Sequence, residues 1–501
     1  MSQGGGPLVT NDPRLKIGGY SAPAYCVLDD KDPMTMGPKG GLCDTYRDSD
    51  LATASVKFAY EMTDHLQFSS LTGVLDGSHS ARTDAIWNGA YARDFDQSFQ
   101  SFQHEMQLTW TSDKWNAVAG LIYFTEDADE KEYTTEQVLS SYTNPASRDR
   151  VLSGPNIERR VETYVMNTKS VALFGQATYS MTDKFDVTLG LRRTQDKKSA
   201  QIQLIPTVDD IRNRSGTGEE SWGATDHRLA LNYKATDDVM VYATRSKAYK
   251  AGIFNDSSIE IGPVTVAPQI MSVSFIEPEE LVSHEVGLRS EWWDRRVRLN
   301  LSLYDQEWTN RQNQRGIVDA ASGITVIITE NQPDVSSRGA ELDFMIAATD
   351  SLTVSGAVGT IKAEQKNNPG FILEGVPERT WQLGVEHRFD VPWGGVIKSS
   401  LNYAWRGAVY STNTQAVDAT GPASVEYNPD YDVLNGRVTY TPDSENWSAA
   451  LYARNILDEY YTYSRFGSTG GFHTGTNNGS SIAASYPGMP RMVGVQLRYN
   501  F

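Results

Sequence analysis

Apolar and polar side chains alternate along most of this chain, from about Thr53 to the last residue. The final residues show the pattern most regularly, with apolar side chains at every second position: Val493, Val495, Leu497, Tyr499 and Phe501. The same alternation recurs at 185–192, 297–303 and 381–389. A period of two places apolar side chains on one face of a β-strand, so the pattern predicts an all-β protein. Soluble β-sandwiches also alternate, so both soluble and membrane β-proteins remain open at this point.

The connections between the predicted strands alternate between very short and long. The short ones are rich in Asp, Thr, Ser and Gly, which suit tight turns, and they lie at 61–65, 111–114, 181–184, 235–238, 293–296, 348–351, 391–395 and 441–446. The long polar segments lie at 125–167, 197–221, 250–280, 311–334 and 456–489. This asymmetry is typical of an outer-membrane β-barrel, whose turns are short on the periplasmic side and long outside.

Tryptophans gather beside the short turns. Six of the 11 tryptophans flank them: Trp110, Trp115, Trp292, Trp293, Trp393 and Trp447. An indole ring prefers the level of the lipid headgroups, so these residues are predicted to form a membrane girdle. The alternative is that they close the ends of a soluble sandwich.

Composition narrows the choice further. The net charge of -18 argues against a nucleic-acid partner, because phosphate recognition requires clustered cations. No apolar run approaches the roughly 18 to 20 residues of a membrane-spanning helix. The N-terminus carries no signal-peptide pattern, so an exported protein would have its start elsewhere.

The strand count suggests an incomplete barrel. About 17 strands are expected, the first starting on the long-loop side and the last ending on the short-turn side. Bacterial single-chain barrels close with an even number. We therefore expect at least one strand to be missing before Leu51, with residues 1–50 forming an outer loop and residues 51–501 the barrel.

Two cysteines lie in that predicted outer loop. Cys26 and Cys43 belong to one stretch rich in Gly and Pro, which would suit a disulfide in an exported protein. The alternative is two unpaired thiols, since spacing alone does not establish pairing.

Catalytic motifs are missing from the sequence. It contains no GxSxG, no P-loop, no HExxH and no CxxC, so we expect neither an enzyme nor a bound cofactor or metal. His284 and Glu285 begin an HExx string without a second histidine, which reads as an ordinary strand. The acidic run 126–132 could hold a divalent cation, but a solvated loop is the favoured interpretation.

Several segments, in a consistent order, resemble the TonB-dependent receptor family. They are FQSFQHEMQLTW (99–110), VTLGLRRTQDKK (187–198), EPEELVSHEVGLRSEWWDRRVRLNLSLYDQEW (277–308), SSRGAELDF (336–344), LYARNILDEYYTYSRF (451–466) and YPGMPRMVGVQLRYNF (486–501). The resemblance implies an antiparallel transmembrane barrel of about 22 strands around an N-terminal plug, of which about 17 strands and no plug are present. It also identifies Tyr499 and Phe501 as the C-terminal assembly signal.

The function that this resemblance implies is uptake of a large, scarce nutrient across the bacterial outer membrane. The expected partners are outer-membrane lipid, TonB acting through the missing plug, and an extracellular ligand such as a ferric siderophore, cobalamin or a glycan. A passive porin-like channel and a soluble multi-sandwich binding protein remain as alternatives.

Overall fold

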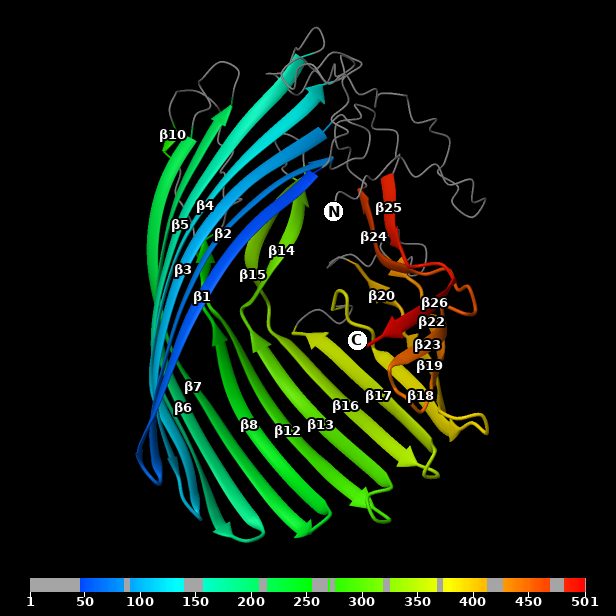
Figure 1. The fold of residues 1–501 in the computed structure, drawn as a ribbon. Helices are drawn as coiled ribbons and strands as arrows, with labels where there is room; N and C mark the ends of the chain where they lie inside the picture. Colours follow the sequence, from blue (N-terminus) through cyan, green and yellow to red (C-terminus); the bar gives the residue numbers. More distant parts are fainter. Residues whose placement is uncertain are drawn as a thin grey trace.

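The computed structural model describes residues 46–84, 91–138, 156–206, 214–254, 269–270, 275–318, 325–366, 373–411, 427–468 and 482–500. These residues form one large antiparallel sheet of 17 strands that curves into an open barrel (Figure 1). The prediction of an all-β fold with about 17 strands is confirmed. The part of the chain that the structure describes contains no helix long and apolar enough to cross a bilayer.

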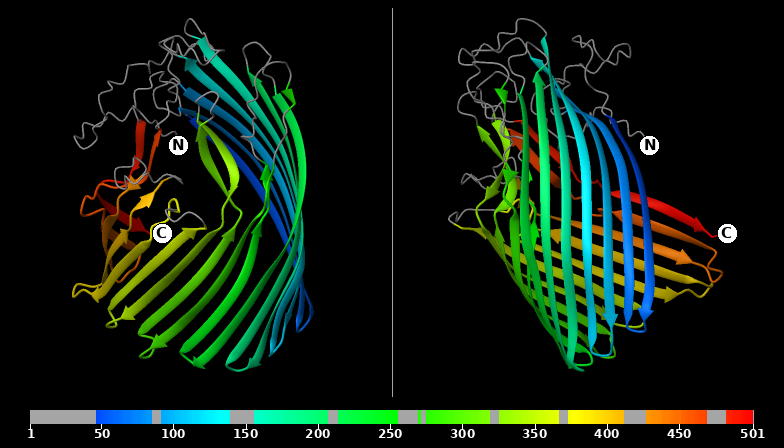
Figure 2. Two further views of the ribbon diagram at one scale, coloured as in Figure 1. Left: turned by 180° about the vertical axis from the view of Figure 1, so that it is seen from behind. Right: turned by 90° about the vertical axis from the view of Figure 1, so that its left-hand side faces the viewer.

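The first strands of the sheet are long. Their bounds are β1 (Tyr46–Thr63), β2 (Leu66–Asp84), β3 (Tyr91–Thr111), β4 (Trp115–Val138), β5 (Asn156–Thr182), β6 (Phe185–Pro206), β7 (Arg214–Thr236) and β8 (Val239–Lys250). We call β1 to β7 the tall wall. It rises well above the rest of the barrel on the long-loop side (Figure 2).

The later strands are shorter. Their bounds are β12 (Glu279–Trp292), β13 (Val297–Thr309), β16 (Val335–Ala347), β17 (Leu352–Gln365), β18 (Arg379–Asp390), β19 (Val396–Arg406), β22 (Tyr431–Thr441), β23 (Trp447–Arg454) and β26 (Met492–Tyr499). We call these strands the short wall. Short pairs lie on the long-loop side: β9 (Ile253–Phe254) with β11 (Phe275–Ile276), β14 (Arg311–Val318) with β15 (Thr325–Gln332), β20 (Val409–Tyr410) with β21 (Tyr427–Asn428), and β24 (Thr462–Ser468) with β25 (Ile482–Pro487). β10 (Gln269–Ile270) adds a two-residue parallel pairing to β7.

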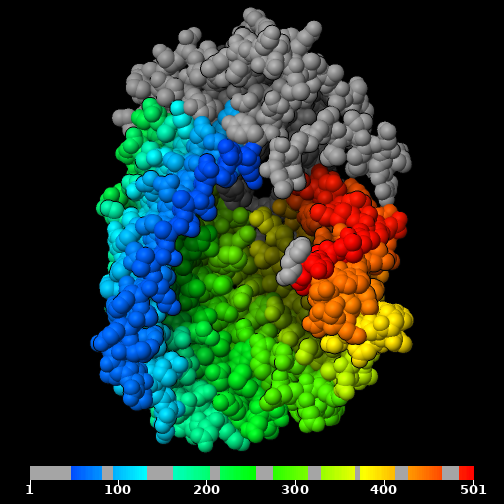
Figure 3. Space-filling view, viewed as in Figure 1, coloured from blue at the N-terminus to red at the C-terminus, as the bar shows by residue number. Residues whose placement is uncertain are grey.

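Each long strand pairs with the next along the sheet, which leaves β1 and β26 at the two edges. No pairing joins these edges within the described ranges. In the space-filling view the two edges, blue and red, are separated by an opening through which the green inner wall is visible (Figure 3). With 17 alternating strands, β1 and β26 both run toward the short-turn end.

Each predicted short turn joins two adjacent strands at the same end of the barrel. The Thr63 hydroxyl accepts hydrogen bonds from the backbone N–H groups of His65 and Leu66. Thr349 does the same for Ser351 and Leu352. A threonine that satisfies two backbone donors explains why these turns are tight.

The two faces of the sheet differ as the alternation predicts. On β26, Val495 and Leu497 are 70% and 76% exposed on the outer face. On β6, Leu189 and Leu191 are exposed in the same way. Apolar side chains that face outward on strands far apart in the sheet, such as β6 and β26, make a surface suited to lipid rather than water.

Two expectations about the loops are corrected. Strands β4 to β7 occupy much of 125–167 and 197–221, which were expected to be loops. The acidic run 126–132 lies within β4, where Gln97 donates to Glu130 at 2.9 Å and Asn167 donates to Asp127 at 2.8 Å. Backbone pairing does not depend on which side chains a strand carries, so β4 continues through this run although the alternation of apolar and polar residues disappears there.

The expected boundary between residues 50 and 51 is also displaced. β1 begins at Tyr46, within the segment that was expected to be an outer loop. The remainder of that segment, including Cys26 and Cys43, lies outside the described residues.

Candidate functional site in the barrel lumen

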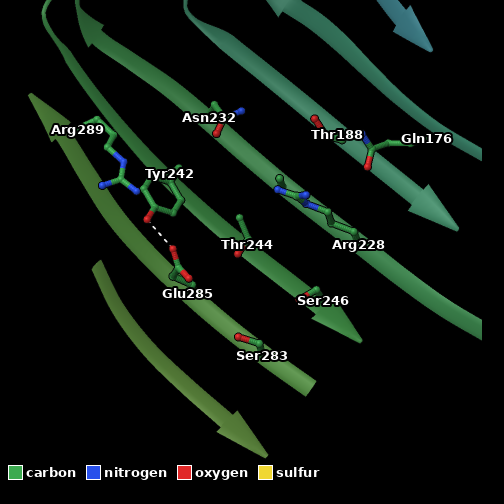
Figure 4. A pocket seen from close by; sticks show the side chains of 11 residues that line it. Gln176, Thr188, Arg228, Asn232, Tyr242, Thr244, Ser246, Ser283, Glu285 and Arg289 are labelled. Carbon is green, nitrogen blue, oxygen red and sulfur yellow. Dashed lines mark hydrogen bonds between the residues drawn. The ribbon is translucent and has the colours of Figure 1, made fainter. Parts of the chain in front are cut away.

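The inner wall carries a hollow of about 510 Å³ over β5, β6, β7, β8 and β12 (Figure 4). Its lining is polar and includes Gln176, Thr188, Arg228, Asn232, Tyr242, Thr244, Ser246, Ser283, Glu285 and Arg289. These residues alternate with the outward-facing apolar ones, such as Leu189 and Val286. The polar half of the strand pattern therefore builds this surface.

Tyr242 organises one side of the hollow. It lies opposite Gly287 in the β8–β12 register. A Cβ atom on Gly287 would stand 2.4 Å from the Tyr242 ring, so glycine is required for the ring to lie across β12. The Tyr242 hydroxyl then donates to Glu285 Oε1 at 2.5 Å (Figure 4).

Arg289 extends this group along the short wall, from β12 toward β16. Its guanidinium carbon lies 5.4 Å from the centre of the Tyr242 ring, within the range of a cation–π contact. One of its nitrogens lies 3.9 Å from Asp343 Oδ2 on β16. Glu285 and Arg289 are thus both held by neighbours while they line the hollow.

The chemistry available in the hollow is hydrogen bonding and charge. Two guanidinium groups, Arg228 and Arg289, and one carboxylate, Glu285, lie among hydroxyl and amide groups. Within the described ranges, no three His, Cys, Asp or Glu side chains come together as a metal site. Such a wall can bind water, polypeptide or a polar solute.

A second polar group, the rim cluster, lies where the β14–β15 hairpin leaves the barrel. It comprises Glu277, Glu279, Arg311, Gln312 and Asn331. The Gln312 backbone N–H donates to Glu279 at 2.7 Å, and the Asn331 amide donates to the Glu277 carbonyl at 2.8 Å. Burial lowers the pKa of the Arg311 guanidinium from its ordinary value, and the nearby carboxylates of Glu374 and Glu279 partly offset that effect.

The connection from β8 to β12 turns back onto the tall wall. Phe275 on β11 packs edge-on against Trp222, with ring centres 5.8 Å apart. Phe254 on β9 packs against Tyr164, with ring centres 6.4 Å apart. This apolar cluster, together with Ile202, anchors the connection on the long-loop side of the hollow.

Four of the predicted girdle tryptophans lie at the short-turn ends of strands, and two lie within the short turns. All six are exposed: Trp110, Trp115, Trp292 and Trp447 in strands, and Trp293 and Trp393 in turns. Their role at a membrane interface stays a prediction. Tyr499 ends β26, opposite Trp447, and Phe501 lies outside the described residues. The structure therefore does not bring the predicted site residues together with the lumen hollow.

The group formed by Tyr242, Glu285 and Arg289 was not identified from the sequence. Glu285 was read as part of an ordinary strand, and it does lie in β12. The available signal was the polar half of the alternation at 283–289, which marks a lumen-facing row. The partner on β8 depends on cross-strand register, which the sequence does not display.

Comparison with known proteins places this fold. The model of the family described as "TonB dependent receptor-like, beta-barrel" matches residues 5–456. Two pesticin receptors are similar in sequence. That of Yersinia enterocolitica is 22% identical over 382 residues, covering 74% of this chain and 48% of the relative, and that of Yersinia pestis is 22% identical over 344 residues, covering 66% and 44%. The chain thus spans about half the length of the curated relatives it matches.

Solved structures agree on the fold. The ferric yersiniabactin uptake receptor FyuA from Yersinia pestis has a TM-score of 0.70 at 17% identity, over 91% of this chain and 62% of that one. The copper transporter OprC has a TM-score of 0.64 at 11% identity, over 91% of this chain and 66% of that one. With the family match covering most of its length, the chain belongs to the TonB-dependent receptor β-barrel family.

Proposed function

We propose that this chain forms the barrel wall of a bacterial outer-membrane receptor that takes up a large, scarce nutrient with energy supplied through TonB. The observation that carries the proposal is the family match over residues 5–456. Among the possible nutrients, a ferric siderophore is favoured over cobalamin or a glycan. The reason is that structural relatives include a ferric yersiniabactin uptake receptor and a ferric-catecholate import receptor from E. coli.

The geometry is compatible with different roles for the long-loop end of the barrel and for its lumen. The tall wall and the hairpins of the short wall would surround an outer vestibule for the ligand. The polar hollow around Glu285 and Arg289 would face a plug or water in the lumen. TonB would act through the plug rather than through this wall.

Closure of the barrel belongs to the same proposal. Both sheet edges run toward the short-turn end, so an antiparallel closure needs an odd number of further strands, whichever polypeptide supplies them. In lipid, each unpaired backbone N–H or C=O group costs several kcal/mol. The edges of β1 and β26 therefore need partners before the wall can be a stable membrane barrel.

The experiment is uptake of radioactive iron by cells in which this gene is deleted or restored. The probes are ferric yersiniabactin and a ferric catecholate. We expect at least one to bind restored cells, with accumulation lost when tonB is deleted while surface binding persists. Accumulation that survives loss of TonB, together with single-channel conductance in planar bilayers, would instead establish the passive porin-like alternative.

A further inference from the structure

The outer face of the short wall carries a second hollow, of about 360 Å³, over β18, β19, β22, β23 and β26. Apolar side chains and a glycine form most of it: Leu401, Gly436, Val438, Leu451, Ala453 and Val493. Leu451 and Val493 are more than half exposed, in line with the lipid-facing row of each strand. This hollow is therefore on the opposite side of the sheet from the lumen site.

The register between neighbouring strands explains why this hollow forms. Gly436 lies opposite Leu401 on one side and Ala453 on the other, and Ala453 lies opposite Val493. The centre of this row has at most one side-chain carbon per residue, whereas Leu401 and Val493 flank it. A Cβ on Gly436 would meet the ends of Ile456 and Leu401 at 3.3 and 3.4 Å, so even one added carbon would begin to fill the hollow.

The hollow is polar at one end. His387 and Ser399 lie opposite each other and line it on the side nearer the short turns. They stand about three residues from the turn at 391–395, or roughly 8 Å along the membrane normal for a strand tilted by about 40°. Gly436 is five residues from the end of β22, or roughly 13 Å from the turns, and so lies roughly 5 Å deeper than His387 and Ser399.

This arrangement has the polarity of a phospholipid. Hydrogen-bonding groups on a lipid-facing surface are costly unless they find a partner, and His387 and Ser399 lie at the end of the hollow that is nearer the short turns and hence the headgroups of that leaflet. Beyond them, toward the bilayer centre, the surface of the hollow is mostly apolar, although Ser400, Arg437 and Tyr452 also contribute to its lining. A molecule with a polar head at one end and a hydrocarbon chain at the other would satisfy both parts.

We propose that this hollow holds one acyl chain of a glycerophospholipid from the leaflet on the short-turn side, whose ester or phosphate oxygens accept hydrogen bonds from His387 and Ser399. The site goes beyond the proposed uptake function and requires only that this wall faces lipid. It would give the short wall one tightly held lipid among the many that exchange freely around the barrel.

The test uses protein extracted from outer membranes in mild detergent, stripped of lipid and titrated with dioleoylphosphatidylethanolamine. Native mass spectrometry then counts the lipids retained. The key variant, Ala453→Leu, fills the hollow. The matched control, Ala449→Leu, makes the same change on the same face of β23, where Ala449 does not line the hollow. We expect Ala453→Leu to lower the fraction with one lipid by about fivefold or more, and Ala449→Leu to leave it unchanged.

A second variant protects the test against failure of Ala453→Leu to fold. His387→Leu leaves the hollow open but removes one of the two hydrogen-bond donors at its polar end, and we expect it to weaken retention as well. Equal retention in wild type, Ala453→Leu and His387→Leu would overturn the proposal. A protein dimer lost in Ala453→Leu, with no lipid retained by wild type, would assign the hollow to a second copy and also overturn it. Because these measurements need neither ligand nor TonB, their failure would leave the uptake proposal standing.

Discussion

The tall wall and the short wall reach above the membrane by different means. In the tall wall, single strands continue without interruption, and β4 and β5 have 24 and 27 residues. In the short wall, β23 and β26 have 8 residues each, and separate hairpins such as β14–β15 and β24–β25 stand beyond the strand ends. One wall is extended by its own backbone ladder, whereas the other depends on side chains at the hairpin roots.

Backbone conformation marks the difference. Asn310 follows β13 and Asn455 follows β23, and both have positive φ, 52° and 49°. In the described part of β1 to β8, no residue has a positive φ. A left-handed residue turns the chain out of the strand, and asparagine tolerates that conformation better than most side chains. Beyond these residues the hairpins are no longer joined to the main sheet by backbone hydrogen bonds. Side-chain hydrogen bonds of the rim cluster and of Asn455 hold them in place instead.

The largest expected effect concerns the edges where the two walls end, β1 and β26. The 501-residue chain by itself should not form a barrel that resists SDS at room temperature, because the edges of β1 and β26, which have no partner strand among the described residues, would face lipid. A form with an odd number of additional strands should run as a compact, heat-modifiable band on unboiled gels. A compact band from the 501 residues alone would show that the edges pair with each other, and the porin-like alternative would gain support.

The two walls should respond equally within the membrane, where both follow the same alternation. Leu189→Arg in the tall wall and Val495→Arg in the short wall should each cost about 2 to 4 kcal/mol, the range for arginine near the bilayer midplane. Gln496→Arg, beside Val495 but on the lumen face, should cost less, because its main loss is the hydrogen bond that Gln496 accepts from Arg437 at 2.6 Å. Folding titrations into lipid vesicles measure these differences, and equal tolerance of Val495→Arg and Gln496→Arg would refute the assigned faces.

Outside the membrane the walls should differ. Asn455 is 2% exposed, and its amide donates to the carbonyls of Glu459 and Met489 while its oxygen accepts from the Glu459 N–H. Asn455→Ala should destabilise the β24–β25 root by about 2 to 3 kcal/mol, because buried backbone groups lose their partners. Asn167→Ala, which removes a bond to Asp127 in the tall wall, should cost about 0.5 kcal/mol. Hydrogen exchange of the segments next to each substitution measures the two effects. Similar losses of protection in Asn455→Ala and Asn167→Ala would contradict the expected difference between the two walls.

The smallest effect is a pH dependence in the short wall. The Lys366 ammonium donates to Glu307 at 2.8 Å and to Asp334 at 3.1 Å, and these bonds raise its pKa above the ordinary lysine value. The stabilisation from these ion pairs should be fully present below the ordinary pKa of lysine. It should be lost as the pH rises through the raised pKa of Lys366. After correction for the intrinsic base catalysis of amide exchange, the protection of amides near β15 and β16 should therefore fall at alkaline pH in wild type but not in Lys366→Met. Identical alkaline profiles would show that this exposed link contributes nothing.

Much of the membrane portion could be predicted from the sequence, because its signals are local. Alternation at 185–192 and 493–499 identified strands and their apolar faces, and the turn residues at 181–184 and 348–351 located the hairpins. The same reasoning failed at 125–167. Above the membrane both strand faces are polar, so the alternation that identifies β4 and β5 is lost while their hydrogen bonds continue.

The chain's own pattern was enough to establish an odd number of antiparallel strands, the end of the barrel at which the short turns lie, and which side chains face outward, since each follows from neighbouring residues. Only the folded sheet decided that Tyr242 would lie across Gly287 to reach Glu285 and that Gly436 and Ala453 would meet to leave a hollow. Those contacts depend on the register between strands, and register is chosen by the simultaneous fit of whole strands. No single stretch of sequence contains that information.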